Sequence, residues 1–307
     1  MQQGRTGRLN PAVARARRAV QRTVDAALGP DVGNGTAPPL VLVGCSGGAD
    51  SLALAAATAH LLRRGRLRVG AVVVDHQLQE GSAEVASRTA ATLRGMGLDP
   101  VYVERVHVAR TGTGPEMAAR LARYEAFRVV AQRSGAAAVL LGHTRDDQSE
   151  TVLLGLTRGS GTRSLSGMPE SLVKDGVCYL RPLLNITRAE TETVCAAEGL
   201  QPWHDPSNAD TALTRSRIRH EVLPFLESQL GPGVARALAR TASVLGADAD
   251  YLEEQAAAAY DDAAVPTRSQ DPRAASSVML DGAGLQQMPA ALRRRVLARA
   301  CVDAGGE

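Results

Sequence analysis

The stretch Leu40-Val41-Leu42-Val43-Gly44-Cys45-Ser46-Gly47-Gly48-Ala49-Asp50-Ser51 decides the fold. An apolar run meets two glycines there, and an alanine- and leucine-rich segment typical of a helix follows. A strand that turns through glycines into a helix leaves backbone N–H groups free at the helix N-terminus, where the helix dipole favours negative charge. Hydroxyl groups at both ends of the turn add further donors. The junction therefore predicts a phosphate-binding loop made of Ser46, Gly47, Gly48, Ala49, Asp50 and Ser51.

The acidic residue of this loop, Asp50, indicates what the loop binds. A carboxylate beside phosphates repels them unless a cation lies between, so Asp50 predicts Mg²⁺ held together with a nucleotide. The other common phosphate loop, GxxxxGK[ST], is excluded because the single lysine, Lys174, is far from any such glycine pair. The alternative is an ordinary glycine-rich turn, against which the full order SGGxDS between a strand and a helix argues.

Length and composition are those of a globular protein. With 307 residues and 44% hydrophobic content, the chain is long enough for about two domains. The net charge of +3 permits nucleic-acid binding without requiring it. No segment reaches the roughly 18 apolar residues of a membrane span, and no signal core follows the N-terminal arginines, so we expect a cytoplasmic protein without membrane contact. The four cysteines form no CxxC pair and predict no disulfide framework.

Short apolar runs separated by helical segments predict the sheet. Continuous runs fit strands that are buried on both faces of a parallel sheet, and they occur at residues 40–43, 69–74, 101–103, 137–141 and 177–180. The helical segments between them space the first four runs for β-α-β crossovers. We therefore predict a doubly wound α/β domain with a parallel sheet of about five strands. Its ligands should gather at the carboxyl ends of the strands.

Both flanks of this domain have helical composition. Residues 10–28 carry valines and an alanine at helical spacing and predict a basic amphipathic helix, with a loop at 29–39. Two further helices are predicted at 231–255 and 290–300, separated by a loop at 266–277. The end of the chain soon after an arginine-rich helix is compatible with a truncated C-terminal domain. We divide the chain into an N-terminal helix and loop (1–38), a catalytic domain (39–228) and a small helical C-terminal domain (229–307).

A second cluster of ionisable residues follows the fourth predicted strand. His143, Asp147 and Glu150 are spaced i, i+4 and i+7, which puts them on one face if the segment is helical. We predict that this face lies opposite the glycine loop, where Asp147 would hold Mg²⁺ with Asp50 and where His143 or Glu150 would transfer a proton. Two alternatives are a solvated helix start, since acids stabilise a first turn, and a zinc site at His143 and Asp147 that lacks further ligands.

Eight short motifs follow one another in order between about residues 40 and 226. They are SGGADS (46–51), DHQL (75–78), AARLARY (118–124), GHTRDDQSET (142–151), TRGSGTRSLSGM (157–168), RPLL (181–184), DPSN (205–208) and RSRIRHEVLP (215–224). This order resembles that of the tRNA(Ile)-lysidine synthetases, a family of PP-loop ATP pyrophosphatases. Eight motifs in one order are far more specific than one loop. The resemblance implies ATP-dependent attachment of free L-lysine to C2 of the wobble cytidine, C34, in the isoleucine tRNA with anticodon CAU.

The same resemblance implies roles for individual residues. The loop would bind the ATP phosphates, and Asp75 and His76 would lie near the nucleotide or the cytidine, with a plain strand-end turn as the alternative. Arg123, which carries the family's Arg-Tyr signature, joins the candidate catalytic residues, and the lysine amine, or ammonium, would contact Asp147. Contacts to substrate or tRNA phosphate are expected from Arg120, Arg158, Arg215, Arg217 and Arg219.

Two residues stand apart from this pattern. Gln79 occupies the place where the family usually has arginine, which puts a charge contact at that position in doubt. Trp203 would either stack on a base or pack in the core.

Other functions make different demands on the sequence. A PP-loop tRNA thiolase would be expected to carry CxxC cysteines, and an amidotransferase-type synthetase would need a source of ammonia. A non-catalytic RNA-binding protein would not require Asp50, His143, Asp147 and Glu150 together. The sequence does not determine the assembly state, and a homodimer is compatible with it.

Overall fold

The computed structural model describes residues 9–29, 37–77, 79, 81–108, 115–158, 161–265 and 278–306. These form two compact units: Met1–Leu153 with Met168–Ala239, and Leu154–Gly167 with Arg240–Glu307. The predicted loop at 266–277 and most of the loop at 29–39 lie outside the described residues. Within the described part of the chain, no helix is both long and apolar enough to cross a bilayer.

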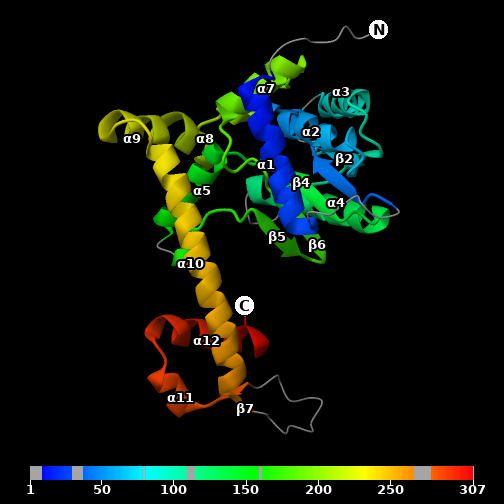
Figure 1. The fold of residues 1–307 in the computed structure, drawn as a ribbon. Coiled ribbons are helices and arrows are strands. Elements are labelled where there is room, and N and C mark those ends of the chain that lie inside the picture. The colour runs from blue at the N-terminus through cyan, green and yellow to red at the C-terminus, as the bar shows by residue number, and fades with distance from the viewer. Residues whose placement is uncertain are drawn as a thin grey trace. The chain divides into compact units, whose positions relative to one another are not determined.

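The first unit contains a six-stranded sheet (Figure 1). The strand order is β3-β2-β1-β4-β6-β5, and all neighbours are parallel except the pair formed by β5 and β6. The five predicted strands are therefore confirmed, and the edge strand β5 is an addition that pairs back on β6 as a hairpin. The strands are β1 (Leu40–Gly44), β2 (Arg68–Asp75), β3 (Val101–Arg105), β4 (Ala138–Leu141), β5 (Ser171–Lys174) and β6 (Val177–Leu180).

Helices cover both faces of the sheet, which confirms the doubly wound architecture. Val41 and Val43 point into one core with α1 (Pro11–Leu28), α2 (Ala49–Leu62), α3 (Ser82–Gly95) and α7 (Arg188–Glu198). Leu40 and Leu42, which alternate with them along β1, point into a second core with Phe127 of α4 (Pro115–Ser134). The continuous apolar run of β1 is thus explained by burial on both faces.

The N-terminal helix α1 belongs to this unit and is not a separate segment. Asn10 caps it by accepting the N–H of Ala12 at 2.9 Å, and Pro11 occupies its first turn. Its apolar stripe is buried in the main core, against α2 and α7, through Val13, Ala16, Val20 and Val24. The predicted amphipathic helix is confirmed, and it packs on α2 and α7, two of the helices that cover the sheet.

The strand order places the two predicted site loops side by side. Successive strands run outward from β1 to β2 and β3 on one side, and the chain then returns to β4 on the other. The order therefore reverses between β1 and β4, which are neighbours in the sheet. Such a switch point opens a crevice at the carboxyl ends of parallel strands. The glycine loop follows β1 and His143 follows β4.

The second unit is mainly helical. Its long helix α10 (Val234–Ala263), which begins in the first unit, buries an alanine every seven residues, at positions 242, 249, 256 and 263. The helices predicted at 231–255 and 290–300 are observed as α10 and α12 (Ala290–Asp303), both longer than predicted. Additional elements not predicted are α6 (Thr162–Leu165), α11 (Gly282–Gln287) and a short hairpin of β7 (Ala264–Val265) with β8 (Met279–Leu280).

Candidate active site

The backbone of the glycine loop between β1 and α2 leaves the N-terminus of α2 uncovered by side chains. Gly47 has a φ of +86°, and a Cβ there would lie 2.5 Å from the hydroxyl of Thr89. Gly48 is the N-cap of α2 and brings no side-chain cap, so no side chain covers the N-terminus. Ser51 Oγ donates to Gly48 O at 3.0 Å and accepts the N–H of Ser46 at 3.2 Å. The loop therefore presents backbone donors at a helix start, which is how proteins bind phosphate.

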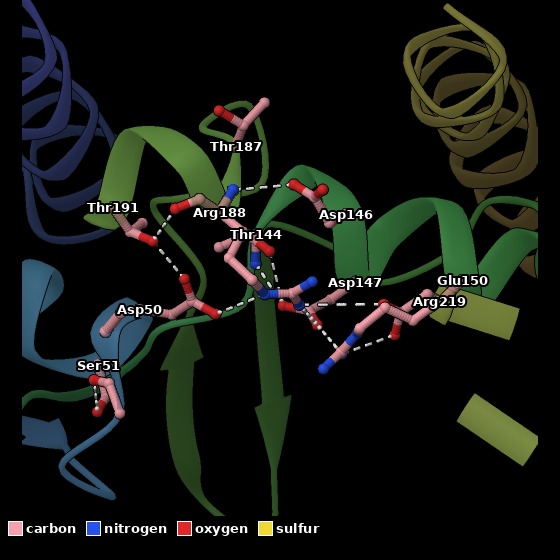
Figure 2. A network of polar contacts seen from close by, with 12 residues as sticks. Asp50, Ser51, Thr144, Asp146, Asp147, Glu150, Thr187, Arg188, Thr191 and Arg219 are labelled. Atoms are coloured by element: carbon pink, nitrogen blue, oxygen red, sulfur yellow. Dashed lines mark hydrogen bonds and ion pairs between the residues drawn. The ribbon is translucent and has the colours of Figure 1, made fainter. Parts of the chain in front are cut away.

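The second cluster begins where β4 meets α5 (Arg145–Thr157). The N–H and hydroxyl of Thr144 donate to Asp147 Oδ2 at 2.8 and 2.9 Å, which caps the first turn of α5. The sequence alternative of a helix-start role for Asp147 is thus partly correct. The other oxygen of Asp147 points away from the cap toward the glycine loop side, where two arginines approach it (Figure 2).

Those arginines join the carboxylates into one network (Figure 2). Arg188 of α7 donates through Nη2 to Asp147 Oδ1 at 3.1 Å, and its Nε lies 3.6 Å from Asp50 Oδ2. Arg219, in the π-helix Ile218–Val222, donates through Nη2 to the same Asp147 oxygen at 3.3 Å. Asp50 and Asp147 are therefore brought together, as the sequence predicts, through an arginine that lies between them.

The environment separates the pKa values of the two aspartates. Burial raises the pKa of Asp50, although the hydroxyl of Thr191, which donates to Oδ1, and Arg188 oppose this effect. Burial also acts to raise the pKa of Asp147, but Arg188 and the hydrogen bonds from Thr144 outweigh it and lower that pKa below its ordinary value. Asp147 is thus the more firmly ionised of the pair.

The side chain of Glu150 lies buried and does not line the space between the glycine loop and Asp147. Its side chain is 0% exposed, and both of its oxygens accept from Arg219, at 2.7 Å from Nε and 3.1 Å from Nη2. Arg215 of α8 (Thr214–Arg217) lies 3.9 Å from it. A buried carboxylate is stable only when a cation pairs with it, and Arg219 pairs with both oxygens of Glu150. This arrangement does not support the expectation that Glu150 transfers a proton to or from substrate.

A cavity of about 480 Å³ lies at the switch point, where all of these elements meet. Its walls also include Trp203 and the segment that follows it, whose Asp205 and Asn208 belong to the DPSN motif. Trp203 is therefore a cavity residue and not a core residue. The predicted site residues that line the cavity are Ser46, Gly48, Ala49, Asp50, Ser51, His76, Arg123, His143, Asp147 and Arg219.

Several arginines surround Tyr124, which lines the cavity together with Arg123. The guanidinium of Arg120 lies 5.0 Å from the centroid of the Tyr124 ring. The buried Arg181 of the RPLL motif donates to the Tyr124 hydroxyl at 3.1 Å. Burial lowers the pKa of His143 to about 3; Asp147 opposes this and the nearby arginines add to it. His143 is therefore neutral at pH 7, and its buried Nδ1 has no partner among the described residues.

Of the two site residues predicted at the end of β2, Asp75 and His76, only His76 lines the main cavity. Burial and Arg123 lower the pKa of His76. Asp75 is buried, accepts the N–H of Gln77 at 3.1 Å, and lines a separate hollow beside α3, so the structure does not place it at the nucleotide loop. Gln79, which stands where the family usually has arginine, donates from its uncharged amide to Asp205 Oδ1 at 2.7 Å.

The predicted tRNA-contacting arginines divide into two groups. Arg215 and Arg219 do share a face, but that face meets Glu150, because the buried carboxylate attracts both cations. Arg217 is exposed and donates to Thr211 O at 3.1 Å. Arg158 is exposed in the second unit, while Gly159 and Ser160 of its loop lie outside the described residues. Only Arg158 and Arg217 of this set point to solvent.

Arg188 and Thr191 are the site residues that the sequence prediction missed. A signal for their position was present, because Thr187-Arg188-Ala189-Glu190 has the form of a capping box. In the structure Thr187 and Glu190 cap each other's backbone, so Arg188 begins α7 and Thr191 follows one turn later. That pattern predicts a helix start and does not reveal which residues it faces.

The carboxylates fit a magnesium ion that binds together with phosphates. Mg²⁺ is usually held by one or two carboxylates, with substrate phosphates and water completing its shell. Asp50 and Asp147 both line the cavity beside the glycine loop and provide such a pair. Among the described residues no group of three or more His, Cys, Asp or Glu side chains could hold a metal ion by itself, so the zinc site considered from the sequence finds no support.

Comparisons with known proteins agree with this geometry. A family model described as a PP-loop domain matches residues 17–226. The tRNA(Ile)-lysidine synthase of Thermobifida fusca is 51% identical over 296 residues, which cover 96% of this chain and 84% of the relative. The chain belongs to the tRNA(Ile)-lysidine synthase family. The Streptomyces coelicolor member is 52% identical over 270 residues, which cover 87% of this chain and 72% of that relative.

A solved structure shows the same fold at low sequence identity. The U34-tRNA thiolase NcsA from Methanococcus maripaludis, with its [4Fe-4S] cluster, superposes with a TM-score of 0.58 at 19% identity. The similarity covers 75% of this chain and 79% of the thiolase. It confirms the PP-loop fold and carries no information on the reaction.

Proposed function

We propose that this protein is a tRNA(Ile)-lysidine synthase, which joins free L-lysine to C2 of the wobble cytidine C34 in the isoleucine tRNA with anticodon CAU. The observation that carries the proposal is the cavity that the glycine loop, Asp50 and Asp147 line together. Family membership supports the substrate, and a cytoplasmic location suits an enzyme that acts on tRNA.

The reaction proceeds in two steps. The C2 oxygen of cytidine attacks the α-phosphorus of ATP, a C2–O–P linkage forms, and pyrophosphate leaves. The ε-amine of lysine then attacks C2, its C–N bond forms, the C2–O bond breaks, and AMP leaves. One proton is released from the amine. The product pairs with A in place of G, so that the tRNA reads AUA and not AUG.

The residues of the first step lie around the glycine loop. Loop 46–51 binds the phosphates through its backbone N–H groups and the start of α2. Asp50 and Asp147 would hold Mg²⁺ beside them, and the ion would supply positive charge to offset that of the phosphates. Arg123, which also lines the cavity, offers a guanidinium to the α-phosphate.

The second step requires a neutral amine. Lysine has an ordinary pKa of about 10.4, so the ε-ammonium must lose a proton before it attacks. Asp147 is the residue suited to hold the ammonium, because it is ionised and lines the cavity. His143 is suited to accept the proton only once phosphate has entered, since anions beside Arg123 and Arg120 would raise its low pKa.

The tRNA contacts would come from Trp203 of the cavity and from exposed arginines. Trp203 provides a flat face for the extruded cytidine, and Arg217 and Arg158 provide exposed cations for backbone phosphate.

Incorporation of radiolabelled L-lysine into transcribed CAU-anticodon isoleucine tRNA, with ATP and Mg²⁺, tests the proposal. Wild type should label the tRNA and release pyrophosphate, and Asp50→Asn should do neither. Asp25→Asn is the matched control, because Asp25 pairs with Arg66 at 2.8 Å and does not line the cavity. Pyrophosphate release stimulated by tRNA without lysine incorporation would assign this chain another tRNA substrate.

A further inference from the structure

The site carboxylates and arginines divide into a tight pair and a looser one. Arg219 binds the fully buried Glu150 through two hydrogen bonds, the shorter of them 2.7 Å. Arg188 makes longer contacts to three carboxylates: 3.1 Å to Asp147, 3.6 Å to Asp50 and 3.9 Å to Glu150. Both arginines therefore neutralise the cluster, but only Arg188 spans the gap between the glycine loop and α5.

The backbone of Arg188 is fixed while its guanidinium is not enclosed. Its N–H donates to Asp146 Oδ2 at 2.9 Å, and the capping box of Thr187 and Glu190 holds the first turn of α7. The side chain is 24% exposed and lines the cavity, so the guanidinium has space to turn into. Asp50 meanwhile keeps a second support, the hydroxyl of Thr191, that does not depend on the guanidinium.

The guanidinium and a metal ion cannot use the same two carboxylates at once. Mg²⁺ binds oxygen at about 2.1 Å, which requires the Asp50 and Asp147 oxygens that now face Arg188. A divalent ion placed there would also repel the guanidinium strongly at such short range. The arginine must therefore move before the metal can bind.

We propose that Arg188 is an internal counter-ion for Asp50 and Asp147, which holds the pair in the free enzyme and gives way when the metal enters with nucleotide. Without Arg188, the carboxylates would keep Arg219 as a nearby cation but would have less positive charge beside them, so they would bind free metal more tightly and would repel the phosphates of ATP. With it, the metal site forms when ATP arrives to complete the coordination shell. The inference rests on the proposed function for the identity of the nucleotide, but not for the metal-binding behaviour.

Mn²⁺ binding without ATP, lysine or tRNA tests this role by electron paramagnetic resonance of the free ion. Arg188→Gln should bind Mn²⁺ at least tenfold more tightly than wild type, whereas Arg188→Lys, which keeps the charge, should stay near wild type. The gain should vanish in the double variant Arg188→Gln with Asp50→Asn, which locates it at this pair. Circular dichroism checks that each variant is folded.

The matched control is Arg17→Gln. Arg17 is similarly half-buried and pairs with Glu198 at 2.9 Å, outside the cavity, so its loss should leave Mn²⁺ affinity unchanged. Equal or weaker Mn²⁺ binding by folded Arg188→Gln would overturn the proposal, as would a gain that persists when Asp50 is replaced. Because the readout requires no lysidine, it succeeds or fails independently of the proposed reaction.

Discussion

Gly142 lies directly against the backbone of Asp50. A Cβ at residue 142 would sit 3.0 Å from both the carbonyl carbon and the oxygen of Asp50, and 3.1 Å from Ser51 Cα. These are backbone atoms in the first turn of α2 and cannot rotate away. The absence of a side chain at Gly142 is thus what lets His143 and the β4 end approach the glycine loop.

Gly142→Ala should therefore reduce the rate of lysidine formation about tenfold, because the backbone must shift by a few tenths of an ångström, and a misplacement of about 1 Å can cost about 100-fold. The cause is displacement of the β4–α5 junction from Asp50. Single-turnover kinetics with saturating ATP measure it. Gly95→Ala is the control, since a Cβ at Gly95 meets nothing within 4 Å. Full activity of the Gly142 variant would show that this close approach is unnecessary.

Thr191→Val should lower ATP-dependent pyrophosphate release by roughly tenfold, because Asp50 loses the hydroxyl that orients its carboxylate. The substitution keeps the shape of a fully buried side chain, so stability should change little by comparison. Thr191→Ser retains the hydroxyl and should preserve the rate. Equal losses in both variants would point to packing and not to the hydrogen bond.

Glu150→Gln should destabilise the fold by about 2 to 4 kcal/mol, because it leaves the partly buried Arg219 without its carboxylate. Urea unfolding measures the loss. Glu125→Gln, which removes an exposed pair with Arg128 on α4, should change stability little. A Glu150 variant that is as stable as wild type but inactive would instead restore a direct role in proton transfer.

His76 should make the protein sensitive to acid. Its pKa is lowered in the fold, mainly by burial and then by Arg123, and returns to about 6.5 on unfolding. Above pH 6.5 both states are neutral and nothing changes. As the pH falls below 6.5, the unfolded chain takes up a proton that the folded one refuses, so stability is lost by at most about 1.4 kcal/mol per pH unit.

Comparison with His76→Gln isolates this contribution. Thermal unfolding of both proteins between pH 8 and 4.5 should give curves that separate below about pH 6.5, with wild type losing stability faster. His143, whose pKa is also lowered, is present in both and cancels. Parallel curves over the whole range would show that His76 titrates normally in the fold.

The strands of the first unit that are buried on both faces could be predicted, because such burial leaves an unbroken apolar run. The runs that became β1 and β4 could be predicted for that reason. The edge strand β5 could not, since only Leu172 is partly covered and its other residues are exposed. The amphipathic stripe of α1 predicted a helix, but its burial against α2 and α7 depended on the complete core.

The site shows the same division between local pattern and tertiary contact. The order of Ser46 to Ser51 determined a phosphate loop by itself, because glycine conformation and a helix start are local properties. Spacing also predicted His143, Asp147 and Glu150 on one helix, of which Asp147 and Glu150 belong to α5 while His143 precedes its first residue, Arg145. Tertiary contacts decided which of them faces the cavity and that Arg188 stands between Asp50 and Asp147. These contacts join residues 41, 69 and 141 positions apart along the sequence, because the packed fold determines which charged side chains meet.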